Sequence, residues 1–295
     1  MIIGQTVIQM DYKDTIIGNV SDFLKWVKTT NTTEVMSDEG EPLAFESDYG
    51  YYRGQSCASW ELKPGVLREP PYLDENSLLK KATLRLWNEI SSLNTFLEKM
   101  IFFQHYGLST RLLDVTFNPL VALYMACCEE YKKSCDGVVY CGHYTESQNV
   151  KIAELTAKYV FENEVQRMIV GFQGFTNKEE VDINCFAQPI FILPPINNPR
   201  IEAQNGAFVM APLISEIIDD NSALPYRNNL GDSDFFDTRR AVIKGNNKDN
   251  ILHELSILGI DSGTIYKSFE EKLKAILSEE KRNSNHYKII HLWEK

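Results

Sequence analysis

The segment from Tyr52 to Gln55 places an arginine at the end of an aromatic strand-like run, directly before a glycine. A guanidinium presents a planar fork of N–H donors that holds a phosphate or a carboxylate at two points. Because Gly54 has no Cβ, a ligand can approach its backbone closely. The pattern indicates an anion site formed by Arg53, Gly54 and Gln55. The alternative is that Arg53 pairs with a carboxylate of the fold beside a turn glycine.

A second polar segment, 104–116, interrupts an otherwise apolar stretch. Buried arginine and aspartate are unfavourable unless they are paired, so one interpretation is an internal Arg111–Asp114 ion pair that fixes the loop. The alternative is a pocket in which His105 stacks on a ligand or hydrogen-bonds it. A serine hydrolase triad could also be drawn here, but closeness in sequence supports it weakly because triads are assembled in space. The candidate residues are Gln104, His105, Tyr106, Ser109, Thr110, Arg111 and Asp114.

A third segment, 200–208, begins with polar residues and continues into an apolar strand. Alternation along a strand would place Glu202 and Gln204 on the same face. We expect these two side chains either to contact a ligand together or to form a solvated strand end.

Several kinds of chemistry have no motif in this sequence. It contains no GxGxxG, GxxxxGK[ST], HExxH or GxSxG. Its six cysteines show neither a CxxC pair nor the paired spacing of a metal site. We therefore expect no metal cofactor, and reduced thiols in a cytoplasmic protein.

The charge balance limits the partners. The 295 residues carry 30 Lys and Arg against 41 Asp and Glu, a formal net charge of −11, which argues against broad binding of nucleic acids. No apolar run approaches the ~20 residues of a membrane span, so we expect no membrane partner. The polar segments nevertheless lean basic, and a locally basic cleft suits a compact anion such as a dinucleotide. They hold Arg53, Lys63, Arg68 and Arg111 against Glu61 and Asp114.

The elements that must position these residues follow from periodicity and turn signals. We expect Ser21 to cap a helix, 29–48 to form a loop, and Asn118 or Thr116 to cap a helix over 120–126. A long or broken helix over 76–106 should end at Gly107. Further helices are expected at 157–172, 250–258 and 268–277, and strands at 1–18, 50–55, 137–142, 189–193, 206–210, 241–244 and 288–292. Helices lead and strands dominate later, which favours a single α+β domain.

Three blocks of the sequence together resemble the FRG domain family. They are YYRGQ (51–55), FFQHYGLSTRLLDVTFNPLVALYMA (102–126) and RIEAQNGAF (200–208), in that order. The resemblance is strong over 48–130 and weaker out to about residue 270. It implies an N-terminal extension over 1–45 packed on the domain, an FRG domain over 46–270 and a helix or strand tail over 271–295.

A more distant similarity is to ADP-ribosyltransferases of the Arg–Ser–Glu type. It implies a mainly antiparallel central sheet that could be split, with helices inserted between the early strands. Arg53 would hold a phosphate of NAD, Ser109 or Thr110 would orient the nicotinamide ribose, and Gln204 would bond the ribose 2′-hydroxyl. The surrounding ligand-binding residues would be Gly54, Gln55, Gln104, His105, Tyr106, Arg111, Asp114 and Glu202.

The sequence departs from that pattern in two places. Ser-Thr-Arg replaces Ser-Thr-Ser, and Gln204 occupies the position of the catalytic glutamate, with Glu202 two residues earlier. A neutral glutamine cannot act as a general base, so NAD hydrolysis, transfer to another acceptor and binding alone all stay open.

Three hypotheses follow. The first is an NAD-using effector of bacterial toxin or phage-defence type, with a protein acceptor or a neutralising protein as its partner. The second is a non-catalytic sensor that binds a nucleotide or another phosphorylated ligand. The third is a structural protein in which Arg53, Arg111 and Asp114 form a buried network.

Overall fold

The computed structural model describes residues 12–36, 42–46, 50–68, 74–143, 150–163, 165, 183–194, 199–219, 222–233 and 235–266. The strands are β1 (Lys13–Ile17), β2 (Thr32–Met36), β3 (Pro42–Glu46), β4 (Gly50–Gln55), β5 (Leu112–Thr116), β6 (Gly137–His143), β7 (Ile190–Ile192), β8 (Gly206–Met210), β9 (Ile214–Asp219), β10 (Ser222–Pro225) and β11 (Arg239–Ile243). The helices are α1 (Val20–Thr30), α2 (Glu75–Arg85), α3 (Trp87–Ile90), α4 (Phe96–His105), α5 (Pro119–Cys127), α6 (Val150–Glu162), α8 (Pro199–Gln204), α9 (Lys248–Ile257) and α10 (Ser262–Ile265).

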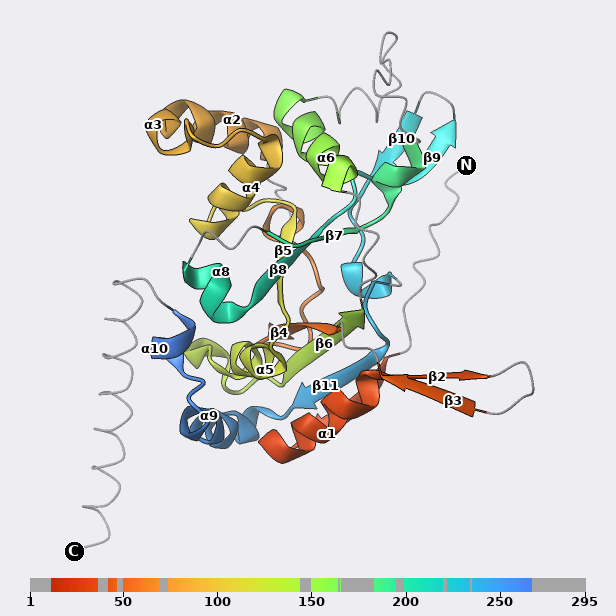
Figure 1. Cartoon of the computed structure of the whole chain (residues 1–295), viewed down its shortest axis with the longest axis vertical. Coiled ribbons are helices and arrows are strands. Elements are labelled where there is room, and N and C mark those ends of the chain that lie inside the picture. Colours follow the sequence, from red (N-terminus) through yellow and green to blue (C-terminus); the bar gives the residue numbers. More distant parts are fainter. Residues whose placement is uncertain are drawn as a thin grey trace, which may run out of the picture.

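A seven-stranded sheet runs in the order β1-β11-β6-β4-β5-β8-β7 through the middle of the molecule (Figure 1). Every neighbouring pair in it is antiparallel except β1 with β11. Helices α2, α3 and α4 lie between β4 and β5 in the sequence, and α5 lies between β5 and β6. The predicted α+β class, with a mainly antiparallel sheet and helices inserted between early strands, is confirmed.

The pairing between β4 and β5 is much weaker than that on either side. β4 pairs along its whole length with β6, and β5 along its whole length with β8. Between β4 and β5, the only residue pair in register is Tyr52 with Thr116. The sheet therefore opens along this line, which we call the seam.

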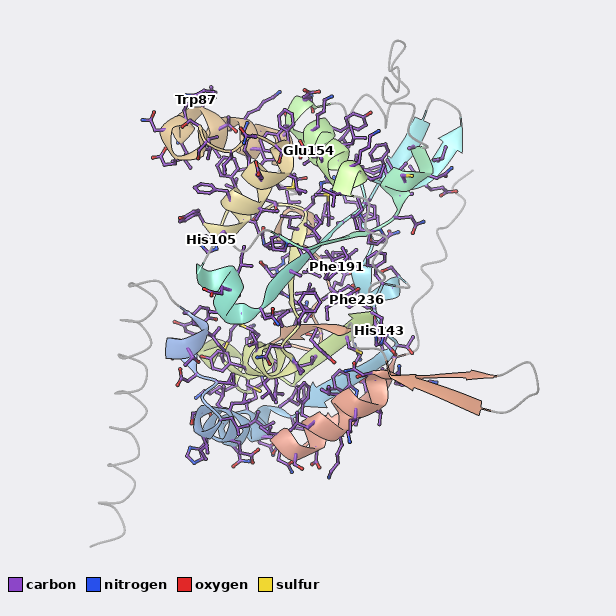
Figure 2. All side chains as sticks on the ribbon, in the orientation of Figure 1. Trp87, His105, His143, Glu154, Phe191 and Phe236 are labelled. Carbon is purple, nitrogen blue, oxygen red and sulfur yellow. The ribbon has the colours of Figure 1, made fainter. Side chains whose placement is uncertain are left out.

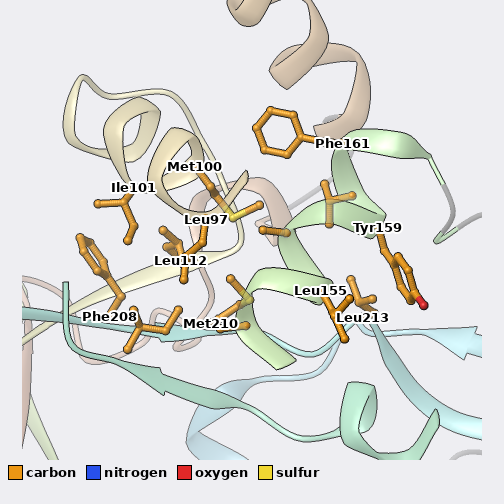
Figure 3. Close-up of a cluster of buried hydrophobic side chains, with 14 of the residues drawn as sticks. Leu97, Met100, Ile101, Leu112, Leu155, Tyr159, Phe161, Phe208, Met210 and Leu213 are labelled. Atoms are coloured by element: carbon orange, nitrogen blue, oxygen red, sulfur yellow. The ribbon is translucent and has the colours of Figure 1, made fainter. Parts of the chain in front are cut away.

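Three apolar clusters hold the fold together. On β4 and β5, Tyr51 and Leu113 belong to a cluster that continues across one face of the sheet. On the other face, Leu112 packs under α2, α4 and α6 (Figure 3), whereas Tyr52 packs under α1, α5 and α9. Two separate groups of helices thus cover two halves of one face, and the boundary between the halves falls at the seam (Figure 1).

Local signals account for several helix ends. The side chain of Asn118 accepts a hydrogen bond from the amide of Leu120, and Pro119 occupies the first turn of α5, as predicted. Gly107 follows α4 with a φ of +88°, a conformation that favours glycine. The predicted helix over 76–106 is broken into α2, α3 and α4.

Four predictions of secondary structure are wrong. Asn19, not Ser21, caps α1, because its side chain accepts the amide of Asp22 at 2.8 Å. The expected loop over 29–48 contains the antiparallel pair β2 and β3. The helix expected over 157–172 is α6, which already begins at Val150. Residues 199–204 form α8 instead of a strand start, so alternation does not place Glu202 and Gln204 on one face.

Some predictions lie outside the described residues. They are the first part of the strand at 1–18, the end of the helix at 157–172, the helix at 268–277 and the strand at 288–292.

Candidate ligand pocket at the seam

A cavity of about 260 Å³ opens where β4 and β5 diverge. Its walls come from both strands, from α5, from the last residue of α8 and from the residue after α10. We call it the seam pocket. The lining residues that carry polar or aromatic groups relevant here are Arg53, Gln55, Trp60, Arg68, Asp114, Thr116, Glu129, Gln204 and Tyr266.

Arg53 bridges the seam with its side chain. Its Nη1 donates to the backbone carbonyl of Asp114 at 2.9 Å and lies 3.9 Å from the Asp114 carboxylate. Burial lowers the pKa of Arg53, and the carboxylate of Asp114 opposes that shift. An arginine stays protonated in proteins, so the guanidinium is a cation in the pocket wall. Its Nε is buried and has no hydrogen-bond partner among the described residues.

Two amide side chains of the same pocket are also incompletely bonded. Gln55 is only 5% exposed, and its Nε2 donates to the carbonyl of Glu61 at 3.4 Å. The Oε1 of Gln55 and the Nε2 of Gln204 are buried without a partner within the described part of the chain. A buried polar group left unpaired costs about 1–3 kcal/mol. All three atoms belong to residues that line one cavity, where water or a ligand would complete their hydrogen bonds once the side chains reorient.

A short hydrogen-bonded chain fixes Asp114 from behind. Gln104 donates through Nε2 to the Asp114 carboxylate at 3.1 Å, and Thr110 donates through its hydroxyl to Gln104 at 2.9 Å. Thr110 itself is fully buried, and its hydroxyl also accepts the amide of Leu112. Gln104 and Thr110 therefore orient a pocket residue without lining the pocket.

Arg111 has a different partner from the one predicted. Its Nε and Nη2 donate to the Glu75 carboxylate at 2.9 and 2.8 Å, and its Nη1 donates to the carbonyl of Pro212. The backbone amide of Arg111 also binds Glu75, at 2.8 Å. The expected Arg111–Asp114 pair is wrong, since Asp114 instead faces Arg53 and Gln104.

The other predicted residues lie away from the pocket lining. Ser109 packs over Gly65, where an added Cβ would lie 3.0 Å from the serine hydroxyl. His105 ends α4 (Figure 2), and its ring lies edge-on to that of Tyr106, which is 70% exposed. Glu202 is exposed on α8. A direct role of these four residues in ligand binding stays a prediction.

Gly54 lines the pocket but also has a packing role. A Cβ at this position would lie 1.9 Å from the carbonyl oxygen of Ala122 on α5. Glycine at position 54 therefore lets α5 pack directly against β4. Its predicted contact with a ligand stays a prediction.

The pocket is charge-balanced, which corrects the expectation of a basic cleft. Its lining contains two cationic side chains, Arg53 and Arg68, and two anionic ones, Asp114 and Glu129. The two other cations of the basic segments are bound elsewhere. Lys63 pairs with Glu61 at 2.7 Å, and Arg111 pairs with Glu75.

Some pocket residues that were not predicted as ligand contacts still had a partial signal in the sequence. Trp60 and Arg68 follow the Tyr52–Gln55 segment closely in the chain. Glu129 and Tyr266 carry no such signal, because only the tertiary fold brings the ends of α5 and α10 to β4.

Within the described residues, no cluster of three or more His, Cys, Asp or Glu side chains could hold a metal ion. None of the helices described is both long enough and apolar enough to cross a membrane.

The protein is an α+β protein whose antiparallel sheet opens beside an arginine-bearing strand, with a polar pocket at the opening. Residues 49–135 match the FRG domain, so an FRG domain is present. The match begins at β4 and includes α2–α5 and β5, and these elements form most of the seam pocket. No curated protein and no solved structure matches the chain at a significant level.

Proposed function

We propose that this protein binds the dinucleotide NAD, with one end of the ligand in the seam pocket. The observation that carries the proposal is that three residues lining one cavity, Arg53, Gln55 and Gln204, each hold a buried polar atom without a partner among the described residues. Two of these atoms are donors and one is an acceptor. Phosphate oxygens would accept from the two donors, and a ribose hydroxyl or a carboxamide N–H would donate to the acceptor.

The charge balance of the pocket favours a ligand with both signs of charge. NAD joins a cationic nicotinamide ring to an anionic pyrophosphate. The carboxylates of Asp114 and Glu129 would offset the positive charge of the ring, and the guanidinium groups of Arg53 and Arg68 would offset the negative charge of the pyrophosphate. Trp60 offers an aromatic surface for stacking at the same cavity.

The size of the pocket limits how much of the dinucleotide it holds. Its volume of about 260 Å³ is just below the roughly 300–1,000 Å³ of pockets for drug-sized ligands. One end of NAD would fit inside, and the other end would extend across the surface. The opening beside an arginine-bearing strand also supports the resemblance to ADP-ribosyltransferases.

Binding without turnover is the form of this proposal that the site supports best. Ser109 and Thr110 do not line the pocket, and Gln204 is neutral. The protein would then act as a nucleotide sensor.

The second candidate function is cleavage of the bond between nicotinamide and ribose. The specific observation in its favour is the Asp114 carboxylate, which lines the pocket and is held in place by Gln104. A fixed carboxylate stabilises the cationic ribose centre that forms as nicotinamide leaves. Attack of water would yield ADP-ribose, nicotinamide and a proton, and attack of a protein group would yield an ADP-ribosylated acceptor. Such an effector could act in toxicity or phage defence, under the control of a neutralising partner.

Isothermal titration calorimetry with NAD, ADP-ribose, AMP and nicotinamide tests the proposal. We expect NAD to bind the wild-type protein and Arg53→Met to abolish that binding. Arg85→Met, which removes an exposed arginine on α2, serves as the matched control and should bind NAD normally. A folded wild-type protein that binds no NAD at about 1 mM, where binding is worth about 4 kcal/mol, would contradict the proposal.

Chromatography of the same mixtures separates the two candidates. Release of nicotinamide that Asp114→Asn abolishes would support cleavage. Binding without release would support the sensor.

A further inference from the structure

Two cysteines lie opposite each other just beyond the paired ends of β4 and β6. The ladder between these strands runs from Gly50 with His143 to Gln55 with Val138. The backbone amide of Ala58 then donates to the carbonyl of Asp136 at 2.7 Å, which continues the contact between the two segments. Cys57 and Cys135 are the immediate neighbours of these two residues, on facing segments.

The two thiols lie close enough to influence each other's ionisation, and the Cys57 sulfur is 3.1 Å from the Ser59 hydroxyl, within hydrogen-bond distance. Because the two cysteines lie on facing segments joined by a backbone hydrogen bond, a side-chain rotation can bring their sulfur atoms together without a large backbone movement. Both cysteines are unpaired in the structure, Cys57 buried and Cys135 half-buried.

A buried lysine holds the two segments together. Lys248 is fully buried, and its Nζ donates to the carbonyl of Ser56 at 2.7 Å and to that of Lys132 at 2.8 Å. These carbonyls precede Cys57 and Cys135 in their respective segments. The charges of Lys132 and Lys248 also favour a thiolate at this site over a thiol.

The pair differs from the thiols in the core. The hydrogen bond from Ser59 lowers the pKa of Cys57, while the bond to Cys57 raises the pKa of Cys135. Burial instead raises the pKa of Cys127 and of Cys141 to about 12. The Cys57 thiol therefore ionises more readily than the buried core thiols, and a thiolate is the form that attacks a peroxide or a disulfide.

We propose that Cys57 and Cys135 form a reversible redox site that a hydroperoxide converts to a disulfide. The Cys57 thiolate attacks the peroxide and becomes a sulfenic acid as the O–O bond breaks, and the leaving hydroxide or alkoxide takes a proton from the solvent to give water or an alcohol. The sulfur of Cys135 then attacks the Cys57 sulfur, which releases water and forms the S–S bond. The cysteines lose two electrons in total, and the peroxide gains them. A dithiol reductant reverses the reaction.

This site lies next to the seam pocket. Gln55 and Ser56, which line the pocket, directly precede Cys57. Trp60 follows it and carries the ammonium of Lys132 over its ring at 5.4 Å. A disulfide would break the contact between Cys57 and Ser59 and shift this wall of the pocket. The redox site itself does not depend on NAD binding, because its test needs no ligand.

Peptide mapping of the full chain tests the proposal. The protein is treated with hydrogen peroxide, its remaining thiols are blocked with N-ethylmaleimide, and it is digested with trypsin without reduction. We expect peptide 54–68 cross-linked to peptide 134–151, with a mass lower by two hydrogens than the sum of the two. Dithiothreitol should separate the peptides.

The controls follow from the sequence. Peptide 134–151 contains both Cys135 and Cys141, so Cys141→Ser must keep the cross-link while Cys57→Ser and Cys135→Ser must lose it. Two results would overturn the proposal: both thiols blocked by maleimide in peroxide-treated wild type, or a cross-link that persists in Cys135→Ser. Fragmentation of the cross-linked wild-type peptides assigns the bond to Cys135 or to Cys141, so a variant that fails to fold does not obscure the result.

Discussion

The seam pocket contains Arg53, and the junction between α2 and β5 contains Arg111; both belong to the blocks that resemble the FRG domain family. The two arginines differ in how completely the fold supplies partners for their hydrogen-bond donors. At the junction, Arg111 is 8% exposed, and its guanidinium and backbone amide bind Glu75 and the carbonyl of Pro212. At the seam, the Arg53 side chain is 21% exposed and its Nη1 lies 3.9 Å from the Asp114 carboxylate. Its Nε has no hydrogen-bond partner in the part of the chain that the structure describes.

This difference separates a structural arginine from a candidate binding arginine. A buried arginine whose N–H groups all donate to protein acceptors stabilises the native state and has no free donor for a ligand. An arginine at an incompletely paired strand edge, beside other unpartnered groups, is positioned to bind one. The residue type is the same in both places, so the hydrogen-bond partners decide the role.

The largest effect is expected at the junction. Glu75→Ala leaves Arg111 buried without its carboxylate and should lower the free energy of unfolding by about 3–5 kcal/mol. Urea denaturation measures this change. Adding Arg111→Met to Glu75→Ala should recover much of the loss, because an uncharged pair needs no salt bridge. A loss below about 1 kcal/mol for the single variant would remove the contrast between the two arginines.

The next largest loss of stability is expected where α5 packs against β4 beside the seam. Gly54→Ala would press a Cβ against the carbonyl of Ala122 and should cost about 1–3 kcal/mol or more in unfolding free energy. Gly206→Ala is the matched control, since its added Cβ would be 3.5 Å from the nearest atom, an ordinary contact. Equal stabilities of the two variants would mean that α5 does not depend on close packing at Gly54.

A smaller effect on the free energy of unfolding, in the stabilising direction, is expected within the pocket. Gln55→Leu removes a buried acceptor that has no partner within the described residues. The unfolding free energy should stay the same or rise by up to about 1 kcal/mol, as when a group kept for function is replaced. Binding of NAD, measured by calorimetry, should weaken. A destabilisation of several kcal/mol would instead indicate a structural role for Gln55.

Local sequence signals correctly predicted those elements whose ends are determined by residues close together in the chain. The strand at 50–55, the end of α4 at Gly107 and the cap of α5 at Asn118 all depend on residues within a few positions of each other. The helix α8 was missed because a six-residue segment of mixed polarity supports a helix or a strand equally well.

The candidate site was harder to predict, because its pairings span long distances in the chain. Glu75 lies 36 positions before Arg111, and nothing in the local pattern selects it over Asp114. Arg53, Gln55, Asp114 and Gln204 were identified from their types and do share the pocket. Which of their atoms lack partners follows only from the packing of β4, β5 and α8.

Thermal unfolding of the wild-type and Arg53→Ala proteins, each with and without NAD, tests the central claim most directly. The account predicts that Arg53→Ala changes the Tm of the free protein by less than about 3 °C, because the Arg53–Asp114 pair is weak. It also predicts that NAD raises the Tm of the wild type and leaves that of the variant unchanged. A large fall in the Tm of the free variant, together with an undiminished shift by NAD, would contradict the claim and make Arg53 a structural residue like Arg111.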